Sequence, residues 1–170
     1  MHGLYLMDKE QRIDNYVYVE HALPNCTSNE LFKGILDDSA HATFNGHVLV
    51  CNNATKTDAS QSNKNILLTD KATVDSKPFL EIYNDDVKCS HGTAIGQLDA
   101  QQIFYMRARG LSEEIAKVLL KQAFMSDVID GVRLSALKDR LRMLVEKRFS
   151  GADASCANCG VDCKNPLDQI

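Results

Sequence analysis

The sequence lacks several features that would place it in a common functional class. It has no excess of basic residues, because 19 Lys and Arg stand against 23 Asp and Glu, for a formal net charge of −4. Without a general positive field we expect neither nucleic acid nor an anionic membrane as a partner. It also contains no Gly-x-x-x-x-Gly-Lys-Ser/Thr loop, so it carries no such motif for hydrolysing ATP.

Long apolar segments are lacking as well. The apolar runs at 48–51 and 66–68 are far shorter than the roughly 20 residues that cross a bilayer. The N-terminus has no basic region followed by an apolar one, and six cysteines without a signal peptide indicate reduced thiols. These absences predict a soluble cytoplasmic protein.

Residues 4–98 show the pattern of a β structure, with no segment that keeps a helical period for long. Short apolar stretches recur at 16–19, 48–50, 66–68, 79–82, 87–89 and 94–96. They leave no room for crossover helices, and Asn45-Gly46 is the only clear two-residue hairpin signal. A parallel β-helix fits this pattern, with polar corners and side-chain ladders supplied by 52–65. The interior residues are then expected to include Val48, Leu67, Ile82, Val87 and Ile95.

Two alternatives remain at this point. The stretch 52–65 is also compatible with a surface loop of a β-sandwich. A β-helix that begins at the chain terminus would moreover expose an unpaired edge. We therefore expect either that the chain is a piece of a longer protein or that its first strand pairs with another subunit.

The pattern becomes helical after Leu98. Asp99 is placed to cap a first helix, which Gly110 ends in a left-handed conformation. Ser112 opens a second helix that runs to about Ile129, with acidic residues at its positive end. A third helix covers about 134–149. We therefore expect a β-helix over 1–98, a helical partner-binding domain over 99–150 and a flexible cysteine-containing tail over 151–170.

A series of motifs resembles the SufB/SufD core family in order and spacing. The motifs are Phe44-Asn45-Gly46, 56–61, 65–68, 78–92, 96–99 and 103–111, with upstream matches at 20–22, Ser28 and 32–34. The form Cys89-Ser90-His91-Gly92 is closer to the SufD branch of the family than to the SufB branch. Family members also have an N-terminal helical region and earlier coils, so the chain is expected to correspond to the C-terminal part of a SufD-type subunit.

The resemblance implies a right-handed parallel β-helix followed by a small C-terminal α-helical domain. It implies a scaffold subunit of the SUF iron–sulfur cluster assembly system, without enzymatic activity of its own. The β-helix would pair with SufB, the C-terminal helices would bind the ATPase SufC, and a homodimer through the β-helix is allowed. A transient iron–sulfur cluster is expected in the assembled complex, with no tightly bound cofactor in the isolated chain.

Cys89 and His91 are the first candidate site. They are two apart on a predicted strand, so their side chains leave the same face and can form a joint ligand pair. The alternative is a buried thiol and a hydrogen-bonded histidine that fill the coil. The resemblance favours His91 as a residue of cluster formation at the junction with SufB, since imidazole and thiolate are good iron ligands. For Cys89 both interpretations remain open.

The second helix has an apolar surface wider than a single packing contact requires. One part of it can bind a partner, or the helix can lie buried between the β-helix and the third helix. The resemblance points to SufC as the partner. The predicted binding residues are Leu120, Phe124, Val128 and Ile129.

The C-terminal cysteines are a third candidate site. Cys156, Cys159 and Cys163 are close enough in sequence for their thiolates to converge on one metal ion. A closed zinc or cluster site normally has four ligands, however, and a solvated tail with reactive thiols is the alternative. The resemblance assigns this tail no role.

Two other functions fit parts of the sequence. One is a small metal-binding module formed by the cysteine tail. The other is a β-helix enzyme of the lyase or acyltransferase type, with Asp85 and Asp86 as paired carboxylates. Neighbouring residues of a strand point to opposite faces, so that pair is poorly arranged for shared acid–base chemistry.

Overall fold

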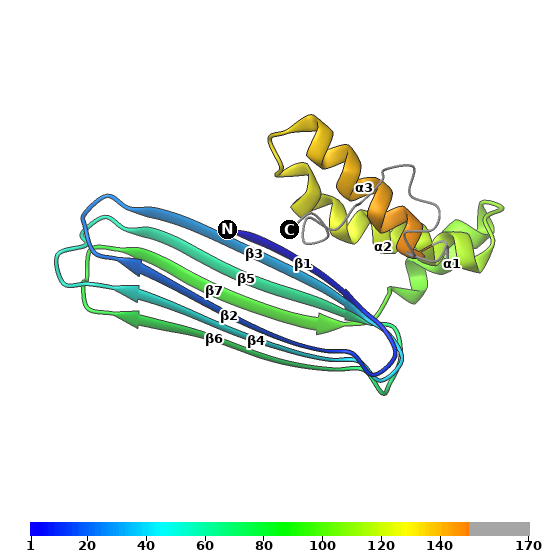
Figure 1. The fold of residues 1–170 in the computed structure, drawn as a ribbon, viewed down its shortest axis with the longest axis horizontal. Coiled ribbons are helices and arrows are strands. Elements are labelled where there is room, and N and C mark those ends of the chain that lie inside the picture. Colours follow the sequence, from blue (N-terminus) through cyan, green and yellow to red (C-terminus); the bar gives the residue numbers. More distant parts are fainter. Residues whose placement is uncertain (150–170) are drawn as a thin grey trace, which may run out of the picture. The chain divides into compact units, whose positions relative to one another are not determined.

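The computed structural model describes residues 1–149, which form seven strands followed by three helices (Figure 1). The strands are β1 (His2–Met7), β2 (Arg12–His21), β3 (Thr27–Leu36), β4 (His41–Val50), β5 (Asp58–Leu67), β6 (Thr73–Ile82) and β7 (Lys88–Gly96). The helices are α1 (Ala100–Ala108), α2 (Glu113–Asp130) and α3 (Ser135–Phe149). Among these residues, no helix combines the length and apolar character needed to cross a membrane.

The strands form two parallel sheets in a solenoid. Sheet A has the order β1-β3-β5-β7 and sheet B the order β2-β4-β6, so the chain passes from one sheet to the other at each corner (Figure 1). Every strand pairing is parallel, and each coil stacks on the previous one. This arrangement confirms the predicted parallel β-helix and excludes the β-sandwich.

Side chains alternate between the interior and the outer surface along each strand. In β4 every second residue from Ala42 to Val50 is buried, including Phe44 and Val48, whereas the residues that alternate with them are partly exposed. Phe44 of sheet B lies 4.9 Å from Phe32 of sheet A, measured between ring centroids. The two inner faces therefore share one thin core, as alternation with a period of two requires. Asn45-Gly46 lies in the middle of β4 and is not a turn.

Strand β5 corrects the prediction of corners in the polar stretch 52–65, because most of that stretch is strand, whose side chains form the other predicted feature, a polar ladder. Asn63 and Asn65 point inward and are buried. Asn63 Nδ2 donates to the Tyr5 hydroxyl at 3.1 Å, and Asn65 Nδ2 donates to Asn63 Oδ1 at 2.7 Å. Buried amides that bond to one another fit a solenoid core, but a search for apolar periodicity does not detect them.

The prediction of interior residues is wrong for Ile82 and Ile95. Val48 is buried, and Leu67 and Val87 are partly buried, but Ile82 is 41% exposed and Ile95 is 47% exposed. Both isoleucines occupy inward-facing register positions. They are exposed because β6 and β7 are the last strands of their sheets, and no further coil of the described chain covers them.

The helices begin and end where the sequence predicts. Asp99 Oδ1 accepts a hydrogen bond from the Gln101 amide at 2.8 Å, and Ser112 Oγ accepts one from the Ile115 amide at 3.3 Å. Gly110, just after α1, has φ of 93°, the left-handed conformation that favours glycine. Helix α2 packs against β1 and β3 of sheet A.

The chain divides into two compact units, one comprising Met1–Gly131 and the other Val132–Ile170. The first unit contains all seven strands together with α1 and α2, and the second contains α3. Strand β7 ends at Gly96 and α1 begins at Ala100, and α1 and α2 group with the β-helix, so the division between units comes after Gly131.

We expect Gly34→Ala to destabilise the protein, because a Cβ at this interior position would overlap the Tyr5 ring and the Asn65 carboxamide. Overpacking of this kind costs about 1–3 kcal/mol, which urea denaturation would measure. Gly92→Ala is the matched control, since nothing lies within 4 Å of its added methyl group. Equal free energies of unfolding for the two variants would contradict the interior packing described above.

Candidate functional site at the open end of the solenoid

The last coil leaves one end of the solenoid open. Strand β7 pairs only with β5 and β6 only with β4, so within residues 1–149 the outer edges of both strands have no partner. Such edges present unpaired N–H and C=O groups that can accept another strand. We call β6, β7 and their inward-facing side chains the open end.

Cys89 and His91 face the same side of β7, as predicted. Cys89 is in register with Ala59 and His91 with Gln61, two residues that point into the core. Cys89 is partly buried and packs on the apolar cluster that includes Val48. His91 is exposed. The imidazole is therefore accessible at the open end, while the thiol is partly covered by the apolar cluster.

His91 ends an interior polar column that the sequence analysis missed. Glu30, Gln61 and His91 occupy successive positions of one register on β3, β5 and β7. Gln61 Nε2 donates to Glu30 Oε2 at 2.9 Å, and each of these two residues is only 2% exposed. Gly46 on the opposite sheet makes room, because a Cβ there would collide with the Gln61 carboxamide. The sequence signal that could have revealed this column is a polar residue at the same inward-facing register position of three successive strands.

The column carries unpaired acceptor atoms. Glu30 Oε1 and Gln61 Oε1 are buried without a hydrogen-bond partner among the described residues. Buried acceptors normally find donors, since leaving one unpaired costs about 1–3 kcal/mol. The interior next to the His91 position is therefore polar and rich in acceptors.

The surroundings of Cys89 favour its protonated form. Burial raises the pKa of the Cys89 thiol, and the Asp58 carboxylate raises that pKa further, although a hydrogen bond with the Ala59 backbone acts in the opposite direction. The thiolate is the nucleophile and the metal ligand. Cys89 must therefore lose its proton before it can bind a metal.

The described residues do not make a complete metal site. Within 1–149, no three or more His, Cys, Asp or Glu side chains are grouped so that they could hold a metal ion. Cys89 and His91 supply two donors, so a closed site at the open end would need ligands from elsewhere. The predicted donors Cys156, Cys159 and Cys163 lie outside the described residues.

Helix α2 is attached to the solenoid by a buried lysine. Lys33 projects from the outer face of β3 and its side chain is 4% exposed. Its Nζ donates to the Phe124 carbonyl at 2.7 Å, lies 2.5 Å from Asp127 Oδ2 and sits 4.7 Å from the Phe124 ring centroid. The hydrogen bond from Lys33 lowers the pKa of Asp127. A buried ammonium needs such partners, so this contact positions α2.

The residues predicted to bind SufC differ in accessibility. Leu120 and Phe124 are partly buried, whereas Val128 is 7% exposed and Ile129 is 4% exposed. The exposed large apolar side chains of α1, α2 and the turn between them are instead Phe104, Tyr105, Leu111, Ile115 and Leu119. A helical pattern shows how wide an apolar surface is, but not which part of it faces a neighbouring element.

We expect Asp58→Asn to speed alkylation of Cys89 by iodoacetamide. Removing the carboxylate lowers the pKa of the thiol, so at pH 7–8 more thiolate is present and the rate rises on the order of twofold. Peptide-resolved mass spectrometry separates Cys89 from the other cysteines. Asp85→Asn removes the same charge elsewhere and should leave the rate unchanged. Equal rates for the two variants and the unaltered chain would contradict the effect of Asp58.

Comparison with known proteins gives a consistent match. Residues 1–124 match the family model described as SUF system FeS cluster assembly, SufBD core domain. The chain is 38% identical over 151 residues to the iron–sulfur cluster assembly protein SufD of Escherichia coli, covering 89% of this chain and 36% of that protein.

Two further relatives extend the match to photosynthetic organisms. An iron–sulfur cluster assembly SufBD family protein of Synechocystis is 45% identical over 146 residues, covering 86% of this chain and 32% of that protein. The chloroplastic protein ABCI7 of Arabidopsis thaliana is 40% identical over 134 residues, covering 78% and 28% respectively. The chain spans about a third of the length of the curated relatives it matches. It belongs to the SufBD core family of iron–sulfur cluster assembly proteins.

Proposed function

We propose that this chain is a SufD-type scaffold that takes part in iron–sulfur cluster assembly by pairing its open end with SufB. The observation that carries the proposal is the placement of His91 and Cys89 on β7, at a strand edge that nothing in the described chain covers. The cluster is cargo in this proposal, held transiently between two chains. The two side chains supply an incomplete ligand set, which the partner subunit completes.

The chemistry of the two edges favours β7 as the pairing strand. Pro78 lies in the middle of β6, and proline has no N–H to donate to an added strand. After Lys88 at its start, the outward-facing positions of β7 carry only small side chains, namely Ser90, Gly92, Ala94 and Gly96. A partner strand can therefore approach β7 closely, in the manner of strand addition to a sheet edge. A second copy of the chain would compete for the same edge.

In the second part of the proposal, helices α1 and α2 form the surface to which the ATPase SufC binds in the cytoplasm. The exposed Ile115 and Leu119 lie one turn apart on α2, next to Leu120. Phe124, Val128 and Ile129 support the helix from its less exposed side. The chain has no phosphate-binding loop of its own, so ATP hydrolysis is assigned to the partner.

We expect His91→Ala to lower the iron and acid-labile sulfide content several-fold in the complex co-expressed with SufB and SufC. Loss of one exposed imidazole deletes a ligand or proton carrier but should cost only about 1 kcal/mol of stability. Ser90→Ala, on the opposite face of β7, is the control and should leave cluster loading intact. A normally loaded complex whose β-helix is severely destabilised would show that His91 is structural. Cys89→Ala should match His91→Ala only if the thiol is itself a ligand.

We expect Leu119→Asp to reduce the amount of SufC that co-purifies with the chain while the circular dichroism of the strands is retained. The leucine is 40% exposed, so the new charge is tolerated in the free chain but is buried unpaired at the interface. Asn53→Asp places the same charge at an exposed corner between β4 and β5, outside α1 and α2, and should bind SufC normally. Phe124→Asp should weaken binding with a loss of stability, because Phe124 contacts Lys33. Undiminished SufC capture by Leu119→Asp would exclude this surface.

A further inference from the structure

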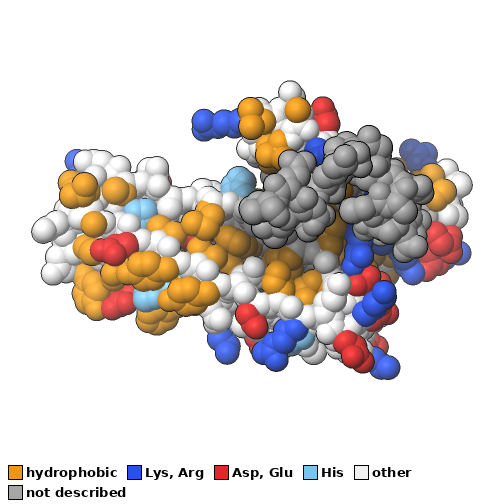
Figure 2. Space-filling view, in the orientation of Figure 1, with side chains coloured by type: hydrophobic (Ala, Val, Ile, Leu, Met, Phe, Trp, Pro, Cys, Tyr) orange, Lys and Arg blue, Asp and Glu red, His pale blue; other side chains and the backbone are white. Residues whose placement is uncertain are grey.

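The outer face of sheet B is aromatic, although the solvent side of a sheet usually carries polar residues. Tyr16 is 71% exposed, Tyr18 44%, Phe79 56% and Tyr83 58%. Figure 2 shows apolar side chains gathered over the solenoid around a histidine. We call this surface, which also includes His47, the aromatic face. Patches of this kind on otherwise polar surfaces mark sites of association.

The centre of the aromatic face is a stack of three rings. Tyr18, His47 and Phe79 share one register position on β2, β4 and β6. The Tyr18 and His47 ring centroids are 5.2 Å apart with an interplanar angle of 86°, and those of His47 and Phe79 are 4.9 Å apart at 73°. Edge-to-face contacts of this kind hold the rings in place before any partner arrives. This central column is therefore a preorganised contact surface.

The columns on either side of the rings carry opposite charge. Two residues before the rings, the outer face presents Tyr16, Asn45 and Lys77; two residues after them it presents Glu20, Leu49 and Glu81. The Glu81 carboxylate also bonds His47 Nε2 at 3.1 Å and the Tyr83 hydroxyl, and these hydrogen bonds lower its pKa. Glu81 therefore stays ionised on the surface, opposite in sign to Lys77.

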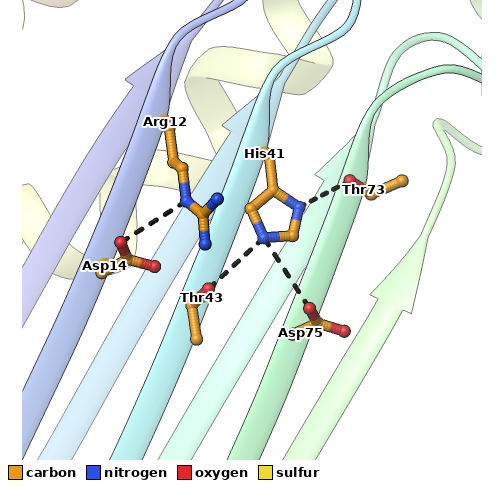
Figure 3. A network of polar contacts seen from close by, with 6 residues as sticks. All are labelled: Arg12, Asp14, His41, Thr43, Thr73 and Asp75. Atoms are coloured by element: carbon orange, nitrogen blue, oxygen red, sulfur yellow. Dashed lines mark hydrogen bonds and ion pairs between the residues drawn. The ribbon is translucent and has the colours of Figure 1, made fainter.

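Beyond Lys77 the face becomes polar and forms a rim. His41 Nδ1 lies 2.8 Å from Thr73 Oγ1, and His41 Nε2 lies 3.7 Å from Asp75 Oδ2 (Figure 3). Arg12 pairs with Asp14 at 3.5 Å on the neighbouring strand (Figure 3). An apolar centre with a polar rim is the usual anatomy of a protein interface.

This pattern is complementary to itself. Consider a twofold axis that lies in the plane of the contact and runs along the ring column. Each column of one copy then faces, in the second copy, the column that lies at the same distance on the other side of the rings. Tyr18, His47 and Phe79 then face their own copies. Lys77 faces Glu81 of the partner subunit, and Tyr16 faces Glu20 of the partner subunit. Each contact between different residues occurs twice and each ring on the axis meets its own copy once, as an isologous interface requires.

We propose that two copies of this chain associate face to face through the aromatic faces of their B sheets. Three ten-residue strands give a face of about 33 by 14 Å, which is small for a stable complex and predicts a weak, concentration-dependent dimer. This contact uses the outer surface of the solenoid, not the free edges of β6 and β7. It therefore does not depend on the pairing proposed for the open end.

Charge reversal tests the proposal directly, with analytical ultracentrifugation of the 170-residue chain in reducing buffer over a range of concentrations. The unaltered chain should show a monomer–dimer equilibrium. In a dimer of either single variant, Lys77→Glu or Glu81→Lys, residues of like charge face each other at two places. Each variant should therefore raise the dimer dissociation constant about tenfold to a hundredfold. An equimolar mixture of the two variants should recover dimerisation, because every unlike pair is restored in the mixed dimer. Lys71→Glu, at a corner outside the aromatic face, should have no effect.

Three outcomes would overturn the proposal. The unaltered chain could remain monomeric at all concentrations, the two variants could dimerise as it does, or their mixture could fail to recover association. Dimers that are abolished by Ala94→Pro in β7 but are unchanged by charge reversal would show pairing through the open end. Circular dichroism of each variant confirms that the strands are retained, so a folding defect would be recognised.

Discussion

The register between successive coils is the constraint on which the other features of this protein depend. Each strand is paired in parallel with the strand one coil away, and side chains alternate between core and surface. A slip of one residue would exchange the two faces of a strand. It would turn Cys89 and His91 outward and bring Lys88 and Ser90 into the interior. The same register aligns the rings of Tyr18, His47 and Phe79 on the outer surface of sheet B.

The core combines apolar clusters with buried amides. Phe44, Val48 and Val50 fill one part of the interior, while Asn63 and Asn65 hydrogen-bond across the other. Buried polar groups that are fully paired help to specify a unique packing, whereas unpaired ones are costly. Both situations occur here, because the Asn63 and Asn65 amides are paired and the Glu30–Gln61 pair retains unsatisfied oxygens. The polar column leads toward the strand position that carries His91.

The surfaces of Met1–Gly131 differ in their physical character. The open end offers backbone hydrogen bonds and two potential metal ligands, the α1–α2 surface offers exposed apolar side chains, and sheet B offers rings flanked by charge. The open end is thus suited to strand addition, the α1–α2 surface to helix docking, and the outer face of sheet B to face-to-face packing. The scaffold role proposed above would require such separate surfaces, since each partner would have to bind without displacing another. Lys33 fixes the α1–α2 surface on the solenoid by tying α2 to sheet A.

Local features were determined by the sequence alone. The caps Asp99 and Ser112 and the left-handed Gly110 act on their own helix ends, so residue type and spacing were sufficient to place them. The strand alternation likewise put Cys89 and His91 on one face. The family motifs identified the β-helix, which apolar spacing alone left open to a sandwich.

Only the tertiary structure decided which of these residues are covered. Ile82 and Ile95 have the pattern of core residues, yet they are exposed because the stack of coils ends at β6 and β7. Val128 has the pattern of a contact surface and is buried. Gln61 and Asn63 are polar in sequence but lie inside, where neighbouring coils supply their hydrogen-bond partners. Burial depends on contacts between residues about 30 or more apart in the chain, as in parallel coils of this length, and no local pattern encodes them.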